Sequence, residues 1–263
     1  MVRMILMGMW MVSTAKAQWG HSNMLAGAAG LSGYKDIFWG ISAYPAAMQK
    51  GTLGIGFFGE KRYMTDLSYY DLAFAGDISG QPFQVRLIRE GNTNFSSTTA
   101  SLAINKKLSD QITIALKPGY TFSVAKGYGS MGQPLAGIGV LFRLNSKLSW
   151  GLQADGINSF FMNTEGRYFV VRTGIGYMVS DLAFLSFEAV KEQGYPVYSM
   201  AGIHYVFMEQ MEAKFGYAFQ LSTASLGLGY RYSGLHLAIS ASYHLSLGAS
   251  AGISVNWQFK SSE

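Results

Sequence analysis

Charged side chains recur along this chain at positions that alternate with apolar residues. Glu212 and Lys214 are two residues apart, and Arg231 lies in the next apolar stretch. Residues two apart in an extended strand point to the same side, so these three charges are expected to share one face of a sheet. Charges of both signs on one face can neutralise each other as buried pairs, or they can line a path for ions.

Two histidines near the C-terminus suggest other kinds of chemistry. His236 and His244 share a face, but eight residues separate them by about 26 Å along a strand, too far to ligate one metal ion. His244 also lies close to Ser246, and a hydrolase needs such a base and nucleophile together with a third group that orients the base. No acidic residue lies nearby in "SYHLSLGAS", residues 242–250. We therefore expect no catalytic residue, no metal and no cofactor.

The segment "GYGSMG" (Gly127–Gly132) has the glycine spacing of a dinucleotide-binding loop. That fingerprint requires a following helix, whose N-terminus meets the phosphates. Here "QPLAGIGVLF" follows, a proline and then a strand pattern. We interpret the glycines as the tip of a loop between strands.

Three consecutive segments near the C-terminus alternate strictly between apolar and small or polar residues. They cover residues 224–232, 235–244 and 249–259. A period of two over about ten residues predicts β-strands with two different faces. A soluble β-sandwich also alternates, but its outward face carries Lys, Glu and Thr. Here the non-apolar face is mostly Gly, Ala and Ser, and Tyr and Trp lie towards the ends of the apolar face, which favours a transmembrane β-barrel.

The composition agrees with that prediction. The chain is 49% hydrophobic and only 13% charged, yet outside the N-terminal region it has no run of 18 apolar residues. Apolar residues must therefore be interleaved with others, as they are in barrel strands. Without the first 17 residues the formal charge falls from +5 to +3, because Arg3 and Lys16 are lost. This is too little to indicate nucleic acid, and the absence of cysteine excludes a disulfide scaffold.

The first 17 residues have the pattern of a cleavable signal peptide. Arg3 precedes an apolar run at residues 4–12, and Ala15 and Ala17 are the small residues before the expected cleavage site. Nine apolar residues are too few for a spanning helix, which needs about 20. We expect a signal peptide at 1–17, an N-terminal segment at 18–50 and a barrel at 51–263, placed in the bacterial outer membrane.

The alternation predicts about fourteen strands, although twelve remain an alternative because the second, seventh and ninth alternate poorly. Tight polar turns are expected to alternate with a second class of connections, several of them longer. An even strand number returns the C-terminus to the side of the N-terminus. The predicted strands are 51–59, 67–76, 82–90, 97–106, 111–123, 134–143, 147–156, 168–178, 182–191, 196–207, 210–220, 223–232, 235–244 and 248–259.

The same alternation assigns a set of charged side chains to the barrel interior. Both signs occur on neighbouring strands, which favours pairs that close the lumen over an ion-conducting path, because conducting porins normally have more strands. The predicted lumen charges are Arg86, Glu90, Lys117, Arg143, Asp155, Arg172, Glu188, Glu212, Lys214 and Arg231.

An irregular segment, "LAGAAGLSGYKDIFWGISAYPAAM" (residues 25–48), precedes the strands. Its "AGAAGLSG" run, Asp36 and "AYPAAM", together with "YMTDLSYYDLAFAGDI" and "LAINKKLSDQITIALKPGYTFS", resemble the FadL-type outer-membrane barrels. The resemblance is greatest to the PorV/PorQ branch, which is associated with type IX secretion. It covers roughly residues 25–160 and is architectural after that. Tyr44 departs from the family, which has Asn at this corner.

The resemblance implies that residues 18–50 form a hatch inside the lumen. Gly27, Gly30 and Gly33 would allow close packing against the wall, and Pro45 would turn the chain into the first strand. Lys35 and Asp36 would pair with lumen charges, with Asp36 touching a basic residue. The alternative is a periplasmic tail, but "IFWGISAY" is too apolar for a solvated linker.

Two functions follow from these expectations. The first is a non-enzymatic accessory or scaffold subunit of an envelope secretion or assembly complex, in contact with outer-membrane lipid and envelope proteins. The alternative is a FadL-like passive transporter of small hydrophobic molecules. The long outer loops that shape the ligand site in fatty-acid transporters are missing from this sequence, which weighs against the alternative at this point.

Overall fold

The structure, a computed structural model, describes residues 43–51, 53–63, 66–157 and 169–259. A short 3-10 helix, η2 (Pro45–Ala47), precedes the strands. No helix among the described residues is both long and apolar enough to cross a membrane. The strands are β1 (Gly54–Lys61), β2 (Ser68–Ile78), β3 (Gln81–Gly91), β4 (Phe95–Lys107), β5 (Ile112–Ala125), β6 (Gly129–Arg143), β7 (Leu148–Asp155), β8 (Val170–Met178), β9 (Ala183–Glu192), β10 (Tyr198–Met208), β11 (Met211–Ala218), β12 (Thr223–Tyr232), β13 (Leu235–His244) and β14 (Gly248–Gln258).

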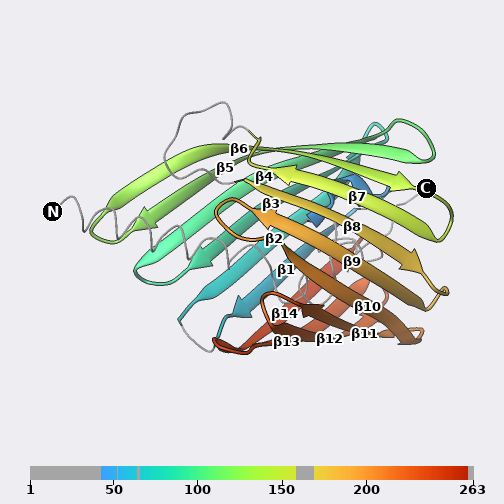
Figure 1. Ribbon diagram of the computed structural model, residues 1–263. Coiled ribbons are helices and arrows are strands. Elements are labelled where there is room, and N and C mark those ends of the chain that lie inside the picture. Colours follow the sequence, from blue (N-terminus) through green and yellow to red (C-terminus); the bar gives the residue numbers. More distant parts are fainter. Residues whose placement is uncertain (1–42, 52, 64–65, 158–168, 260–263) are drawn as a thin grey trace.

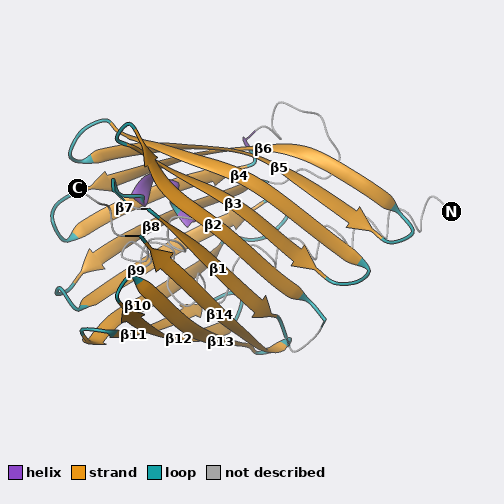
Figure 2. Ribbon diagram, turned by 180° about the vertical axis from the view of Figure 1, so that it is seen from behind, coloured by secondary structure: helices purple, strands orange, loops and turns teal. Residues whose placement is uncertain are grey.

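The strands close into one antiparallel barrel (Figures 1 and 2). Each strand pairs with the next along the chain, and β1 pairs with β14 through a register that runs from Gly54 and Gln258 to Lys61 and Ala251. The predicted fold class is confirmed, with fourteen strands rather than twelve. Closure leaves no free edge along the paired length, which is how a sheet crosses lipid without unsatisfied backbone groups.

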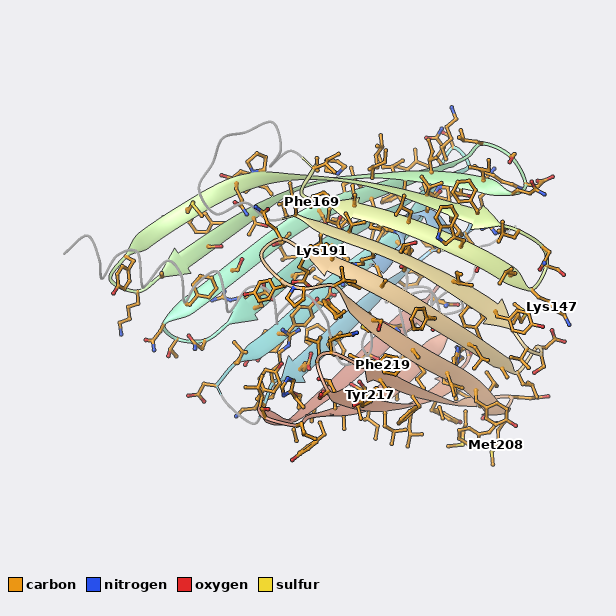
Figure 3. All side chains as sticks on the ribbon, viewed as in Figure 1. Lys147, Phe169, Lys191, Met208, Tyr217 and Phe219 are labelled. Atoms are coloured by element: carbon orange, nitrogen blue, oxygen red, sulfur yellow. The ribbon has the colours of Figure 1, made fainter. Side chains whose placement is uncertain are left out.

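The outside of the barrel is apolar. On β12 and β13, for example, Leu226, Leu228, Leu237 and Ile239 are between 41 and 60% exposed. Figure 3 shows side chains such as Tyr217 and Met208 along this outer surface. Exposure of so much hydrocarbon to water would cost about 25 cal/mol per Å², so this surface suits contact with lipid. The alternation of the sequence therefore predicted correctly which side chains face outward.

The two ends of the barrel differ in their connections. We call "short-turn end" the end that holds the turns after β2, β4, β6, β8, β10 and β12, and "loop end" the opposite one. Ser79 and Gly80, and likewise Ser233 and Gly234, all have positive φ. Two-residue turns of this conformation match the twist of a hairpin. β1 begins and β14 ends at the short-turn end, as an even number of strands requires.

Two expected long connections at the loop end are wrong. The turn after β5 is only residues 126–128, and β6 begins at Gly129 instead of 134. The turn after β3 is residues 92–94. The residues expected in these two loops extend the neighbouring strands instead. Their small and polar side chains alternate, and such a pattern is compatible with pairing in a sheet as well as with a loop. The expected connection between Asp155 and Val170 includes residues 158–168, which lie outside the described residues.

The extended strands make the barrel wall uneven. Gly137 of β6 pairs with Asp155, the last residue of β7, so residues 129–136 continue past β7 while still paired with β5. Figure 1 shows β5 and β6 projecting beyond β7 and β8 at the end away from the C-terminus. The "GYGSMG" glycines lie in this hairpin and lead into a strand, so they do not form a nucleotide loop.

Candidate functional site in the barrel lumen

The first described residues lie inside the barrel at its short-turn end. Ala43, Tyr44, Ala46 and Ala47 form one buried cluster with inward-facing Ala115 of β5, Leu141 of β6 and Phe184 of β9. In both ribbon views η2 lies near the end of the barrel that holds the C-terminus. Burial of these side chains against the wall removes apolar surface from water, which holds the segment in place.

Asn105 of β4 fixes the backbone of this segment. Its Nδ2 donates to the carbonyl oxygen of Met48 at 2.8 Å and lies 3.4 Å from that of Pro45. Asn105 is 2% exposed. A buried amide that meets two carbonyl groups satisfies polar atoms that would otherwise lack water.

Tyr44 is also buried in this cluster, at 1% exposed. Burial, followed by the negative charge of Glu188, raises the pKa of its phenol well above the ordinary 10.0, while Arg172 acts in the opposite direction. Tyr44 therefore brings two predicted lumen charges, on β8 and β9, close to the N-terminal segment. The other predicted hatch residues, Gly27, Gly30, Gly33, Lys35 and Asp36, lie outside the described residues, and so does the predicted contact of Asp36.

The predicted lumen charges form ion pairs with one another and with residues that we did not predict. Lys117 lies 3.1 Å from Asp155, two strands away. Arg86 pairs with Asp71 of β2 through both its Nε, at 3.1 Å, and its Nη2. Asp71 was missed, although the alternation of β2 places it on the inner face with Tyr69. Arg143 donates to Thr113 at 3.2 Å.

A second missed pair lies where the chain leaves β1. Arg62 is 3.4 Å from Glu60, and both side chains are buried. The Arg62 guanidinium also lies 4.8 Å from the centre of the Tyr69 ring. The sequence does not predict this ion pair, because both residues lie at the end of a predicted strand, where the alternation is least regular.

The largest group of charges, which we call the Glu212 cluster, surrounds one carboxylate at the short-turn end. Lys214 Nζ lies 3.3 Å from Glu212 Oε1, and Arg231 Nη2 bonds Glu212 Oε2. His204 and His236 each lie 3.2 Å from the same carboxylate. The cluster thus spans β10 to β13, with two certain positive charges around one negative charge.

Two inward-facing glycines allow these pairs to cross an intervening strand. Gly229 of β12 lies between Glu212 and His236, and an added Cβ would come within 2.7 Å of both side chains. Gly137 of β6 lies between Lys117 and Asp155, and an added Cβ would come within 2.5 Å of the Asp155 carboxylate. Any larger residue at either position would separate the paired charges.

The lumen also has an apolar side. Near the loop end, inward-facing residues of β8 to β11 form a buried cluster, which we call the loop-end apolar cluster. It consists of Val170, Val190, Tyr198, Met200 and Ala218, with Leu221 packed against it. At its margin the Tyr198 hydroxyl donates to Glu192 at 2.7 Å.

His244, the residue considered as a base for hydrolysis, already accepts hydrogen bonds from the backbone. His244 Nδ1 accepts the backbone N–H groups of Ser246 and Leu247, each at 3.1 Å. Because the lone pair of Nδ1 is used in this way, the other ring nitrogen carries the proton, and neutral His244 has no free lone pair to activate Ser246. His236 lies at the other end of β13, in the Glu212 cluster. Within the described part of the chain, no group of three or more His, Cys, Asp or Glu could hold a metal ion.

No protein-family model matches the sequence, and no curated protein matches it. Solved structures do resemble the barrel. The CymD monoaromatic hydrocarbon channel superposes with a TM-score of 0.60 at 13% identity, over 84% of this chain and 92% of that one. The toluene transporter TodX of Pseudomonas putida gives 0.57 at 8%, over 82% and 91%. The outer-membrane protein Omp33 of Acinetobacter baumannii gives 0.54 at 7%, over 79% and 99%. The chain therefore has the fold of outer-membrane barrels.

Proposed function

We propose that the protein is a bacterial outer-membrane channel for small hydrophobic molecules. The transporter alternative from the sequence is now preferred over the accessory subunit of a secretion complex. Two of the similar structures are channels or transporters for monoaromatic hydrocarbons by their descriptions, and none of the three is described as an enzyme. No contact of a described residue supports the PorV/PorQ branch in particular.

The loop-end apolar cluster is the observation that carries this proposal. Much of the inner wall is polar, as in barrels that pass water-soluble solutes, but the loop-end apolar cluster interrupts the polar lining. Here Val170, Val190 and Met200 are at most 2% exposed on the inner face. They place hydrocarbon in the inner wall at the end through which a ligand would enter, and a ligand would reach it by displacing the side chains packed over it.

The N-terminal segment has a role in this proposal as a plug. Its described part, Ala43–Met48, is buried against the lumen wall. Residues 18–42 would continue within the lumen and would make the passage narrow enough to exclude ions. Removal of residues 25–42 would then increase the uptake of a hydrophobic probe and admit ions.

Uptake of radiolabelled toluene by cells that produce the protein tests the transport function. Met200→Gln keeps the length of the side chain but places an amide in the loop-end apolar cluster, so toluene uptake is expected to fall. Met208→Gln is the matched control, since Met208 lies on the same strand at 61% exposure and at the other end of the barrel. Equal uptake by both variants would contradict the proposal.

A further inference from the structure

The exposed charges of the barrel are distributed unequally between its two ends. Within the described part of the chain, the short-turn end carries as many exposed acids as exposed cations, so these charges cancel. The loop end carries four exposed cations and one exposed acid, a net charge of +3. The cations of the short-turn end are Lys50, Lys106, Lys107 and Lys147, and its acids are Asp77, Asp110, Asp181 and Glu209. The cations of the loop end are Lys61, Arg89, Lys126 and Lys191, and its acid is Asp66.

Two of the loop-end cations also lack a partner in the chain. At the short-turn end, Lys107 lies 2.6 Å from Asp110. Among the described residues of the loop end, neither Lys61 nor Arg89 has a hydrogen bond or an ion pair through its side chain. Both are therefore available to an anion from outside the chain.

Lys61 and Arg89 lie on the same outer face, on either side of β2. Arg89 of β3 is beside Tyr70, and Lys61 of β1 is beside Ser68, two residues further along β2. At ordinary strand spacings the Cα atoms of the two cations are about 12 Å apart, so their long side chains can approach one anionic group from both sides. We call Lys61, Tyr70 and Arg89 the rim patch.

The rim patch lies at the margin of the apolar outer surface. Further from the loop end on the same three strands, Phe57, Leu72 and Leu87 are 41, 43 and 47% exposed. The Tyr70 ring stacks on that of Phe57, with the ring centres 6.4 Å apart. Tyrosine is favoured where hydrocarbon meets the headgroups of a bilayer, and lysine and arginine extend their charged ends from apolar surface into the same layer. The rim patch therefore suits the level of the lipid headgroups.

The chemistry of the rim patch matches a lipid phosphate. A guanidinium group binds phosphate through two parallel hydrogen bonds, and an ammonium group adds a compact positive charge. The adjoining apolar surface favours a lipid over a soluble anion, because acyl chains would cover Phe57 and Leu72 while the headgroup meets the two cations. A soluble anion would leave that hydrocarbon uncovered.

We propose that the rim patch binds a phosphorylated lipid of the outer leaflet. The acyl chains of the lipid pack on the outer face of β1 to β3, and its phosphate groups lie between Lys61 and Arg89. The loop end then faces the cell exterior, and the electrically balanced short-turn end faces the periplasm. This site lies on the outside of the wall, so it does not depend on passage of any molecule through the lumen.

Native mass spectrometry of the purified barrel in detergent, titrated with lipid A, tests this proposal. Lipid A carries phosphate groups on its headgroup, and the wild-type protein is expected to bind it more tightly than dephosphorylated lipid A. One basic side chain near an anionic headgroup strengthens attachment about fivefold, so Lys61→Gln and Arg89→Gln together should weaken binding about 25-fold. Arg89→Lys keeps the charge and should retain most of the binding.

Lys106→Gln and Lys147→Gln together are the matched control. They remove two exposed cations from the opposite end of the barrel, where Figure 3 shows Lys147, and they should leave the binding of lipid A unchanged. Heat-dependent migration on a gel establishes that both double variants are folded. Equal binding by the two double variants, or equal binding of lipid A with and without phosphate, would overturn the proposal.

The placement in the outer leaflet has a test of its own, because the chain contains no cysteine. Lys126→Cys, at the loop end, should react with a membrane-impermeant maleimide in intact cells, whereas Lys147→Cys should react only after the cells are broken. The reverse pattern would overturn the placement. Toluene uptake by the Lys61→Gln and Arg89→Gln double variant should equal that of the wild type, so failure of this proposal is distinct from failure of the hydrocarbon channel.

Discussion

The short-turn end of the lumen is filled in two different ways on its two sides. Against β4 to β6, the segment Ala43–Met48 fills it with apolar side chains and a fixed backbone. Across β10 to β13, the Glu212 cluster fills it with charges that neutralise one another. Apolar packing loses stability in proportion to the atoms removed, whereas a buried charge cluster fails when one sign is removed. The two sides should therefore respond very differently to single substitutions.

The largest loss in the free energy of unfolding is expected for Glu212→Gln. The substitution leaves the buried Lys214 ammonium, with the partly exposed Arg231 beside it, without a counter-charge, and an uncompensated buried charge costs about 3–5 kcal/mol in the free energy of unfolding. Urea unfolding in lipid vesicles, followed by tryptophan fluorescence, measures the loss. Asp110→Asn is the control, because Asp110 pairs with Lys107 at 2.6 Å on the surface with its side chain 97% exposed, and solvent screens such a pair. Equal stability of the two variants would contradict the central role of Glu212.

A smaller loss is expected for Gly229→Ala. The new methyl group would push Glu212 away from His236, and forced overpacking of this kind typically costs about 1–3 kcal/mol. Gly227→Ala is matched in strand, face and chemistry but meets only ordinary contacts, so it should be close to neutral. The same urea unfolding measurement compares them, and a neutral Gly229→Ala would show that the glycine is not needed for the pair.

Asn105→Ala tests how the N-terminal segment Ala43–Met48 is held against the apolar side of the lumen. It removes the amide that bonds the Met48 carbonyl oxygen and leaves that oxygen buried, a loss of about 1–3 kcal/mol. The effect should be confined to the N-terminal segment, so residues 43–48 should become more accessible to protease while the barrel stays folded. Ser101→Ala, on the same face of β4, serves as the control. Unchanged protease resistance would mean that apolar packing alone holds the segment.

The smallest effect is expected at Tyr44 and depends on pH. Burial raises the pKa of Tyr44 above 10.0 in the folded protein, so its contribution is complete below pH 10 and is lost as the pH rises through the folded-state pKa. Tyr44→Phe should therefore flatten the decline in stability above pH 10 and change little at pH 7. Urea unfolding at pH 7 and at pH 10.5 measures this difference. Parallel declines in both proteins would contradict the role of burial.

Much of the fold could be predicted because one rule, the alternation of faces, determines most of a barrel. The bounds of β12 and β13 agree with the prediction, since their apolar residues alternate without exception with small or polar ones. The rule fails at the start of β6, because Gly129 and Gly132 do not indicate which face they belong to and their spacing predicts a loop. Glycine and proline are frequent in turns, and only pairing with β5 shows that these residues continue a strand.

The site was harder to predict than the fold. The alternation placed Glu212, Lys214 and Arg231 on one face, but which charges touch depends on register and on side chains that cross a strand. Lys117 reaches Asp155 only because Gly137 lies between them. A single sequence does not give the register of the strands. A glycine that lets two charged side chains meet across a strand therefore cannot be distinguished from any other glycine.

The β5–β6 hairpin projects beyond the neighbouring strands on one side of the barrel. Eight residues of β6, 129–136, continue past the end of β7, a length of about 26 Å along the strand at roughly 3.3 Å per residue. With the short-turn end facing the periplasm, the tip at residues 126–128 would extend outward beyond the end of β7, where an antibody or a bacteriophage could bind it. An epitope tag inserted at this tip would therefore report surface display in intact cells without touching the lumen.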